Sequence, residues 1–218
     1  MSDVKPVAPR VPQALQTAGD LLQLLRKDVT VTALRTTNQD LQGIHIKSCV
    51  TQEVHFEKVN FSAATLEATS FLDTEILNCT FVTSALSDAS WQRVLVADSL
   101  CTGLQLQTSL LKDVVFRNCK LNLTNFRFTK CQRVLFVDSD LTEADFYNAE
   151  LTDVAFQNCI LHKTQLSGVK LTRVDFRGSD IRTILGVNSL RGAIIDSVQL
   201  AELAPLLAAE LQIHVQDE

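Results

Sequence analysis

The chain has 218 residues, of which 46% are apolar, and a net charge of -5 at neutral pH. This length and apolar content suffice for one domain with a buried core, whereas the negative charge weighs against direct binding of nucleic acid, which needs clustered Lys and Arg. No segment approaches the roughly 20 apolar residues of a membrane span, and the N-terminus lacks the basic start and apolar run of a signal peptide. We therefore expect one domain with no membrane partner, preceded by a disordered tail at residues 1–12.

Residues 13–40 are expected to cap the N-terminal end of this domain. Apolar residues recur at helical spacing between Gln13 and Lys27, and the segment from Val29 to Leu34 alternates as a strand does. A repetitive domain must cover its open core at each end to avoid edge-to-edge association. The segment therefore predicts a helix followed by a strand that together close one end of the repeats.

From Leu41 to Ile181 a large apolar residue recurs at nearly every fifth position, and a small or β-branched residue usually lies two positions before it. A period of five fits neither the roughly 3.6 residues of a helical turn nor the 2 of a strand. Each unit must therefore turn a corner and bring its large residue back inside. The aromatic residues of this series, expected in the core, are Phe56, Phe61, Phe71, Phe81, Trp91, Phe116, Phe126, Phe136, Phe146, Phe156 and Phe176.

A second period of twenty residues indicates how many units make one coil. Val94, Val114 and Val134 lie twenty apart, which predicts four units per coil. Outward residues follow the same period, because Asp73 is followed by Arg93 after twenty residues and the alternation of sign continues along the chain. Stacked coils should therefore place opposite charges over one another.

Residues 143–147 (EADFY), 148–152 (NAELT) and 178–182 (GSDIR) resemble the repeating unit of pentapeptide-repeat proteins, in which a small residue, an Asp or Asn and a Leu or Phe recur. The resemblance implies an all-β solenoid, a right-handed quadrilateral parallel β-helix, here with small helical caps at both ends. Residues 41–197 should form this β-helix. With parallel coils about 4.8 Å apart, about seven coils would make a rod about 35 Å long.

The end of the chain departs from the repeat. The phase breaks at residues 182–189 and resumes at Leu190, so four extra residues are expected to loop outward near Gly186. Residues 198–218 should form a helix, bent or restarted at Pro205, and then a short strand. This order resembles the dimerisation element of the fluoroquinolone-resistance pentapeptide proteins, which implies a tail-to-tail homodimer; a helix that only caps its own monomer is the alternative. The candidate interface residues are Leu200, Leu203, Leu206, Leu207, Leu211, Ile213 and Val215.

Catalytic or cofactor chemistry has little support in the sequence. All six cysteines fall on the two inward series, so they should be free, buried thiols of a protein in the reducing cytoplasm. No Cys or His pair has the spacing of metal ligands, and there is no phosphate-binding glycine loop. His45, His55 and His162 should point outward on different sides. We expect no catalytic residue, no metal site, no cofactor and no enzymatic activity.

The functional hypotheses therefore concern residues at the surface. An acidic belt without any Lys or Arg lies between Arg133 and Lys163 and consists of Asp138, Asp140, Glu143, Asp145, Glu150 and Asp153. The resemblance to the fluoroquinolone-resistance group implies a DNA mimic that regulates or protects DNA gyrase. Basic residues on the coils before and after the belt favour alternating bands of charge instead. The preferred hypothesis is a non-enzymatic interaction or scaffold module for an unidentified protein partner, and the alternative is the regulator of gyrase.

Overall fold

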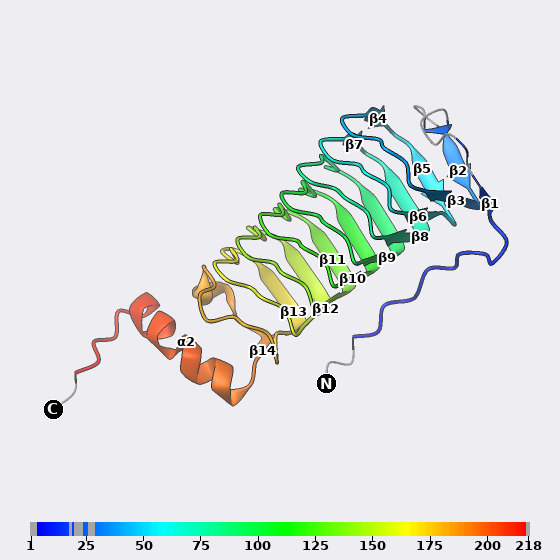
Figure 1. Cartoon of the computed structure of the whole chain (residues 1–218). Helices are drawn as coiled ribbons and strands as arrows, with labels where there is room; N and C mark the ends of the chain where they lie inside the picture. The colour runs from blue at the N-terminus through cyan, green and yellow to red at the C-terminus, as the bar shows by residue number, and fades with distance from the viewer. Residues whose placement is uncertain (1–3, 18, 20–23, 26–28, 217–218) are drawn as a thin grey trace.

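The computed structural model describes residues 4–17, 19, 24–25 and 29–216. The chain forms a parallel β-solenoid of about nine turns, with a small helix at its C-terminal end (Figure 1). The first strands are short: β1 (Gln16–Thr17), β2 (Thr30–Thr32), β3 (Leu34–Thr37), β4 (His45–Lys47), β5 (Val50–Gln52), β6 (His55–Glu57) and β7 (Thr65–Glu67). Longer strands follow: β8 (Ser70–Leu77), β9 (Ser90–Ala97), β10 (Leu110–Arg117), β11 (Lys130–Val137), β12 (Glu150–Gln157) and β13 (Lys170–Asp175). The last elements are the 3-10 turn η1 (Val187–Ser189), β14 (Ala193–Ile194) and α2 (Ser197–Glu210).

The register of the main sheet confirms that four five-residue units make one coil. Its strands follow the order β1-β3-β6-β8-β9-β10-β11-β12-β13-β14, and the pairings of the described strands are parallel. Partners lie twenty residues apart along the repeat, as Val114 and Val134 do. Short bridges with the same offset, such as Gln105 to Asn125, hold the other sides of the coil together.

The expected number of seven coils was too small. At the start, Gln16 pairs with Leu34 over 18 residues, and at the end Val174 pairs with Ala193 over 19. These outer turns do not keep the twenty-residue period, so the side-chain pattern does not mark them. Main-chain hydrogen bonds decide strand pairing, and they extend the solenoid beyond the regular repeats at both ends.

Stacked aromatic rings fill the interior of the solenoid. The eleven aromatic residues predicted for the core are each at most 3% exposed. Phe136 lies between Phe116 and Phe156, with ring centroids 5.2 and 4.9 Å away. A second column, containing Phe126 and Phe146 at 4.5 Å, meets the first edge to face. Burial of these rings, together with the Leu, Val and Ile side chains of the same core, stabilises this fold.

The backbone conformation at the corners of the coils explains which residue types occur there. The backbone at these corners is left-handed, with φ of 48° at Asp73 and 53° at Asn78, and Asp, Asn and Gly tolerate this conformation best. Leu123 and Phe128 occupy two such corners with φ of 60° and 57°. Their side chains are 52% and 49% exposed, so these two bulky residues contribute little to the core.

The N-terminal region differs from the prediction. Gln16–Thr17 form β1 instead of the start of a helix, because their backbone pairs with β3. Of the predicted helix at residues 13–27, residues 13–17, 19, 24 and 25 lie within the described part of the chain and the others lie outside it. Leu25 is buried against the first coils. The predicted strand that follows corresponds to β2 and the beginning of β3.

Residues 4–12, which we name the N-terminal strap, are not the disordered tail expected for residues 1–12. They have no regular secondary structure, yet they lie along the outside of the solenoid (Figure 1). The backbone N–H of Val7 donates to Asp113 Oδ1 at 3.1 Å, and that of Arg10 donates to Asp73 Oδ1 at 3.0 Å. The strap therefore crosses several coils and is held by side chains of the repeats.

The phase break near Gly186 is not an outward loop of four residues. The turn from Val174 to Ala193 uses 19 residues, one fewer than a full coil, and η1 tightens it. Losing one residue shifts a five-residue period by the same amount as gaining four, so the side-chain phase alone did not distinguish the two. Gly186 has a φ of 78° and permits the tight turn.

Helix α2 covers the C-terminal end of the core. It begins with a capping box in which Asp196 and Gln199 each accept a backbone N–H of the other, and it continues through Pro205 without the expected break. Leu203 is fully buried, and Gln199 Nε2 donates to the carbonyl oxygens of Phe176 and Ser179. The strand expected near Ile213 is absent, because residues 213–216 have no regular structure. Within the described part of the chain, no helix has the length and apolar character needed to cross a membrane.

Candidate functional site

The acidic belt lies at the surface, but its carboxylates are paired with groups on neighbouring coils. Two of them, Asp138 and Glu143, are exposed, and the others are half-buried. The N–O distances of the pairs are 3.7 Å for Asp140–Lys120, 3.7 Å for Glu143–Lys163, 3.6 Å for Asp145–Arg127, 2.9 Å for Glu150–Lys170 and 2.5 Å for Asp153–Arg173, and Asn158 donates to Asp138 at 2.6 Å. These distances are shorter than the screening length of about 8 Å at physiological salt. The pairing favours alternating bands of charge over one continuous negative surface.

A second line of charge runs along a corner of the solenoid. This charge ladder consists of Asp73, Arg93, Asp113, Arg133, Asp153 and Arg173, at the left-handed positions within β8 to β13. Arg93 donates two hydrogen bonds of 2.6 Å to Asp73. Arg133 and Arg173 bind Asp113 and Asp153 in the same bidentate way. The stacking of opposite charges predicted from the sequence is therefore present along this corner.

The environment keeps the ladder carboxylates ionised. The hydrogen bonds from Arg93 hold the pKa of Asp73 below its ordinary value; burial opposes this shift, and the backbone N–H of Arg10 adds to it. Burial raises the pKa of Asp113, but the hydrogen bonds from Arg133 and from the Val7 N–H outweigh it, so the pKa is lowered overall. Both groups are negative at neutral pH, although they are almost completely covered.

The strap accounts for this cover. The Asp73 and Asp113 side chains, which accept the strap N–H groups, are 6% and 4% exposed, whereas the Asp153 side chain is 29% exposed. This contact was not predicted from the sequence. The signal that could have revealed it is the spacing of Pro6, Pro9 and Pro12, because prolines three apart favour an extended polyproline II segment.

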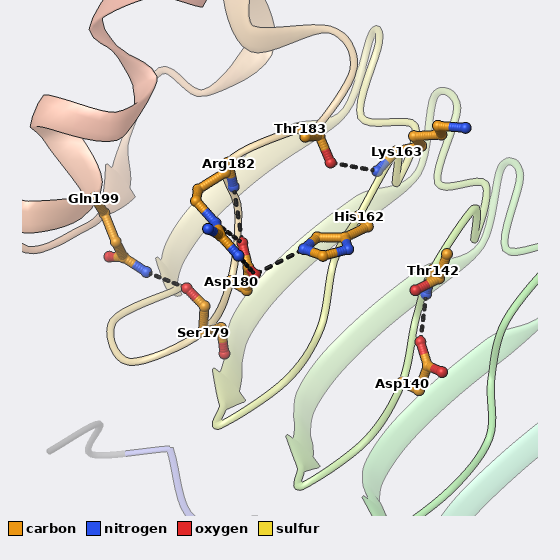
Figure 2. A network of polar contacts seen from close by, with 9 residues as sticks. All are labelled: Asp140, Thr142, His162, Lys163, Ser179, Asp180, Arg182, Thr183 and Gln199. Carbon is orange, nitrogen blue, oxygen red and sulfur yellow. Dashed lines mark hydrogen bonds and ion pairs between the residues drawn. The ribbon is translucent and has the colours of Figure 1, made fainter.

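A polar network holds the last coil together (Figure 2). Asp180 lies 2.7 Å from His162 Nε2, and Arg182 donates to both of its carboxylate oxygens. The hydrogen bonds from Arg182, together with His162, hold the pKa of Asp180 far below its usual range. The His162 and Arg182 side chains are 42% and 56% exposed, so this cluster lies on the outer surface instead of in a closed pocket. It joins the last coil to the preceding one and lies beside Ser179, whose carbonyl accepts from Gln199 of α2.

The buried thiols have the environment of structural cysteines. Burial raises the pKa of Cys79 and Cys119 to about 11 and that of Cys131 to about 12, so these thiols stay protonated and are poor nucleophiles at neutral pH. His55 differs from its predicted outward, solvated position: it is 8% exposed and lies 2.9 Å from Glu75 on the next coil. Among the described residues, no three His, Cys, Asp or Glu side chains form a cluster that could hold a metal ion.

The candidate dimer residues separate into two groups. Leu203 is buried, and Leu206 and Leu207 pack against the core, as a cap requires. The exposed group consists of Leu200, Leu211, Ile213 and Val215, at 53%, 68%, 56% and 77% exposure. An apolar groove of about 500 Å³ lies between the last coil and the second half of α2, and its lining includes Leu190, Ile195 and Leu211.

The sequence and the fold were compared with known proteins. A family model described as a pentapeptide repeat region matches residues 109–184. No curated protein matches the sequence. Among solved structures, HetL from the cyanobacterium Nostoc sp. strain PCC 7120, a pentapeptide-repeat protein involved in regulating heterocyst differentiation, is 14% identical over 78% of this chain and 91% of its own, with a TM-score of 0.42. A trypsin-treated form of QnrB1, a plasmid-mediated fluoroquinolone resistance protein, is 16% identical over 88% of this chain and 100% of its own, with a TM-score of 0.36.

The match to this family model agrees with the repeat in the sequence. The matched range covers the second half of the run of five-residue units that extends from Leu41 to Ile181, and the units before the matched range keep the same phase. The structure folds them into coils of four units with the large residue of each unit inside. Residues 109–184 therefore match the pentapeptide-repeat family in both sequence and coil geometry.

Proposed function

We propose that this chain is a non-enzymatic protein-interaction module of the cytoplasm that binds its partner through the outer surface of the solenoid. The filled interior is the observation that carries this proposal. Stacked rings occupy the centre of the coils, and the cavity between Leu25 and the first coils measures about 20 Å³, roughly the space of one water. Among the described coils, the stacked rings therefore occupy the space that a substrate would need, whereas the exterior offers long columns of stacked polar side chains.

Affinity capture tests this function. The tagged full chain is used as bait in a lysate of its host, with heat-unfolded bait as the control. We expect a protein that the folded bait retains, that excess untagged chain displaces, and that binds again when purified. If no protein meets these three criteria, the interaction module loses its basis.

Regulation of DNA gyrase is the second candidate, and the exposed carboxylates of Asp138 and Glu143 in the acidic belt are the observation in its favour. The measurement is a supercoiling reaction with the host gyrase, with and without a fluoroquinolone. Because five of the six belt carboxylates are paired with Lys or Arg on neighbouring coils, we expect no inhibition at large excess of the chain. Inhibition at a near-stoichiometric ratio, abolished when the six belt residues are replaced by Ser, would make gyrase the leading partner.

We also propose a tail-to-tail homodimer through the C-terminal element. Leu211, which is exposed, lines the apolar groove, and the exposed Ile213 follows it in the chain, so a two-fold axis could place the tail of each copy in the groove of the other. Light scattering at micromolar concentration should give twice the chain mass of 24.1 kDa. Leu211→Glu with Ile213→Glu should restore the monomer, whereas Leu123→Glu, at an exposed corner far from α2, should not. A monomeric mass for the unmodified chain contradicts the dimer.

A further inference from the structure

We propose that the charge ladder is a docking site for an extended, proline-spaced polypeptide segment, and that the N-terminal strap is its resident occupant. The proposal deepens the proposed function and rests on it, because it identifies the place and the chemistry through which this interaction module binds a partner. The occupant seen in the structure is part of the same chain, and a partner would present the same pattern of backbone donors.

The spacing of the donors matches the spacing of the acceptors. Asp73 and Asp113 lie two coils apart, which is about 9.6 Å at the usual distance between parallel strands. Val7 and Arg10, which bind them, are three residues apart. Three residues of a polyproline II segment rise by about 9.3 Å. One turn of such a segment therefore matches two coils of the solenoid.

The sequence of the strap has the same period. Pro6 directly precedes Val7, and Pro9 directly precedes Arg10, so each donor N–H follows a proline. Proline fixes its own φ and biases the preceding residue toward extended structure, which lowers the entropy that binding must offset. A segment with this spacing presents consecutive N–H groups on one side, facing consecutive carboxylates of the ladder.

The ladder recognises main chain. Asp73 and Asp113 each keep a bidentate arginine and still accept a strap N–H through Oδ1, as Asp113 does from Arg133 and Val7. Such charge-assisted bonds are stronger than neutral ones. The two carboxylates that accept a strap N–H, Asp73 and Asp113, are 6% and 4% exposed, whereas Asp153 is 29% exposed. Contacts with backbone groups leave the side chains of the bound segment free to vary.

A groove beside the ladder offers a place for those side chains. It has a volume of about 430 Å³ and runs across the first halves of β9 to β12, with Lys112, the residue before Asp113, in its lining. Leu110 lies in the same groove and is 52% exposed. Apolar side chains of a docked segment would contact Leu110, which gives a partner an additional means of discrimination beyond its donor spacing.

The first test removes one donor and observes the other. Val7→Pro deletes a single N–H from a segment that already contains three prolines and lies outside the core. We expect the Arg10 amide of the full chain to exchange its hydrogen about tenfold faster, because the two contacts hold one strap cooperatively. Ala8→Pro is the matched control, since the Ala8 N–H has no acceptor among the described residues, and it should leave the Arg10 exchange rate unchanged. Equal exchange in the two variants contradicts the role of the donor.

The second test asks whether the site accepts a segment in trans. A fluorescent peptide with the sequence of residues 4–12 is titrated into the full chain and into the variant carrying Val7→Pro and Arg10→Pro, and binding is followed by anisotropy. A tethered strap competes at an effective concentration of about 1 mM, so the peptide should bind the variant about tenfold more tightly than the unmodified chain. A control peptide in which proline replaces both donor residues should not bind. Equal affinity for both proteins, or no binding to the variant, overturns the proposal.

The outcome separates this inference from the proposed function. If the peptide fails to bind while affinity capture still retains a partner, the interaction module stands and the ladder is not its docking site. If the variant carrying Val7→Pro and Arg10→Pro retains more of the partner than the unmodified chain does, both proposals are supported.

Discussion

Replacing Phe136 with Ala is expected to destabilise the solenoid by about 4 kcal/mol, the range observed when a fully buried Phe is truncated in a well-packed core. Phe136 is 0% exposed and stacks between Phe116 and Phe156, and it meets Phe126 and Phe146 edge to face. The truncation would remove ring contacts to both neighbouring coils and leave a cavity that a rigid parallel ladder cannot close.

Urea unfolding followed by circular dichroism and by the fluorescence of the single tryptophan measures this loss. Trp91 lies in the core and so reports on the middle of the solenoid. Phe128→Ala is the matched control, because Phe128 is 49% exposed at a left-handed corner and its loss should change stability by less than about 0.5 kcal/mol. A loss below about 1 kcal/mol for Phe136→Ala would contradict a core in which ring stacking couples the coils.

Replacing Arg93 with Ala is expected to cost about 3 kcal/mol, because it leaves the Asp73 carboxylate covered and without its guanidinium. The Asp73 side chain is only 6% exposed, and both of its oxygens accept from Arg93. Removing one partner of a covered ion pair costs more than the pair itself contributes, since the remaining charge cannot recover its water. Urea unfolding at neutral pH measures the effect.

The same ladder supplies the control for this substitution. Arg173→Ala breaks the equivalent pair with Asp153, in which the two side chains are 66% and 29% exposed, so water can replace the guanidinium and the loss should be far smaller. Acid should reduce the effect of Arg93→Ala. The folded-state pKa of Asp73 is lowered, so its stabilisation is present above the ordinary value of 3.8 and is lost as the pH falls below it. If Arg93→Ala and Arg173→Ala lower the free energy of unfolding equally, the burial of Asp73 has no effect on the energy of its ion pair.

The regular part of the fold could be predicted because one residue per unit must fill the interior. The five-residue recurrence of side chains such as Phe116 and Phe136 is dictated by packing, and the twenty-residue period of Asp73 and Arg93 by the stacking of coils. The positions of the acidic belt at the surface followed from the same alternation. The number of units per coil and the inward position of the large side chains could therefore be predicted from packing alone.

The ends could not be predicted in the same way, because other forces determine them. Gln16–Thr17 pair through backbone groups, which leave no side-chain period. The shortened turn at Gly186 and an outward loop of four residues produce the same phase shift. The strap is held by N–H donors of Val7 and Arg10, and a backbone donor is present at every residue except proline. Only the spacing of its prolines carried information about this contact.

The consequence for function is that charge on this solenoid acts in two ways. Five of the six carboxylates of the acidic belt are paired with Lys or Arg on neighbouring coils, as Glu150 is with Lys170, which is the arrangement of a structural surface. In the charge ladder, Asp73 and Asp113 accept backbone N–H groups of the strap in addition to the hydrogen bonds from their arginines. The binding surface of the module is therefore expected at the corner of β8 to β13 and in the adjoining groove.

The most direct test of the central claim, that the chain binds a partner and catalyses no reaction on it, uses the purified partner recovered by affinity capture. The partner is incubated with the chain at a tenth of its concentration, about tenfold substoichiometric, and analysed by mass spectrometry and by titration calorimetry. We predict a complex of fixed stoichiometry in which the amount bound scales with the amount of chain, and a partner whose mass is unchanged. Conversion of most of the partner to a product of different mass by this small amount of chain would show turnover and contradict the account.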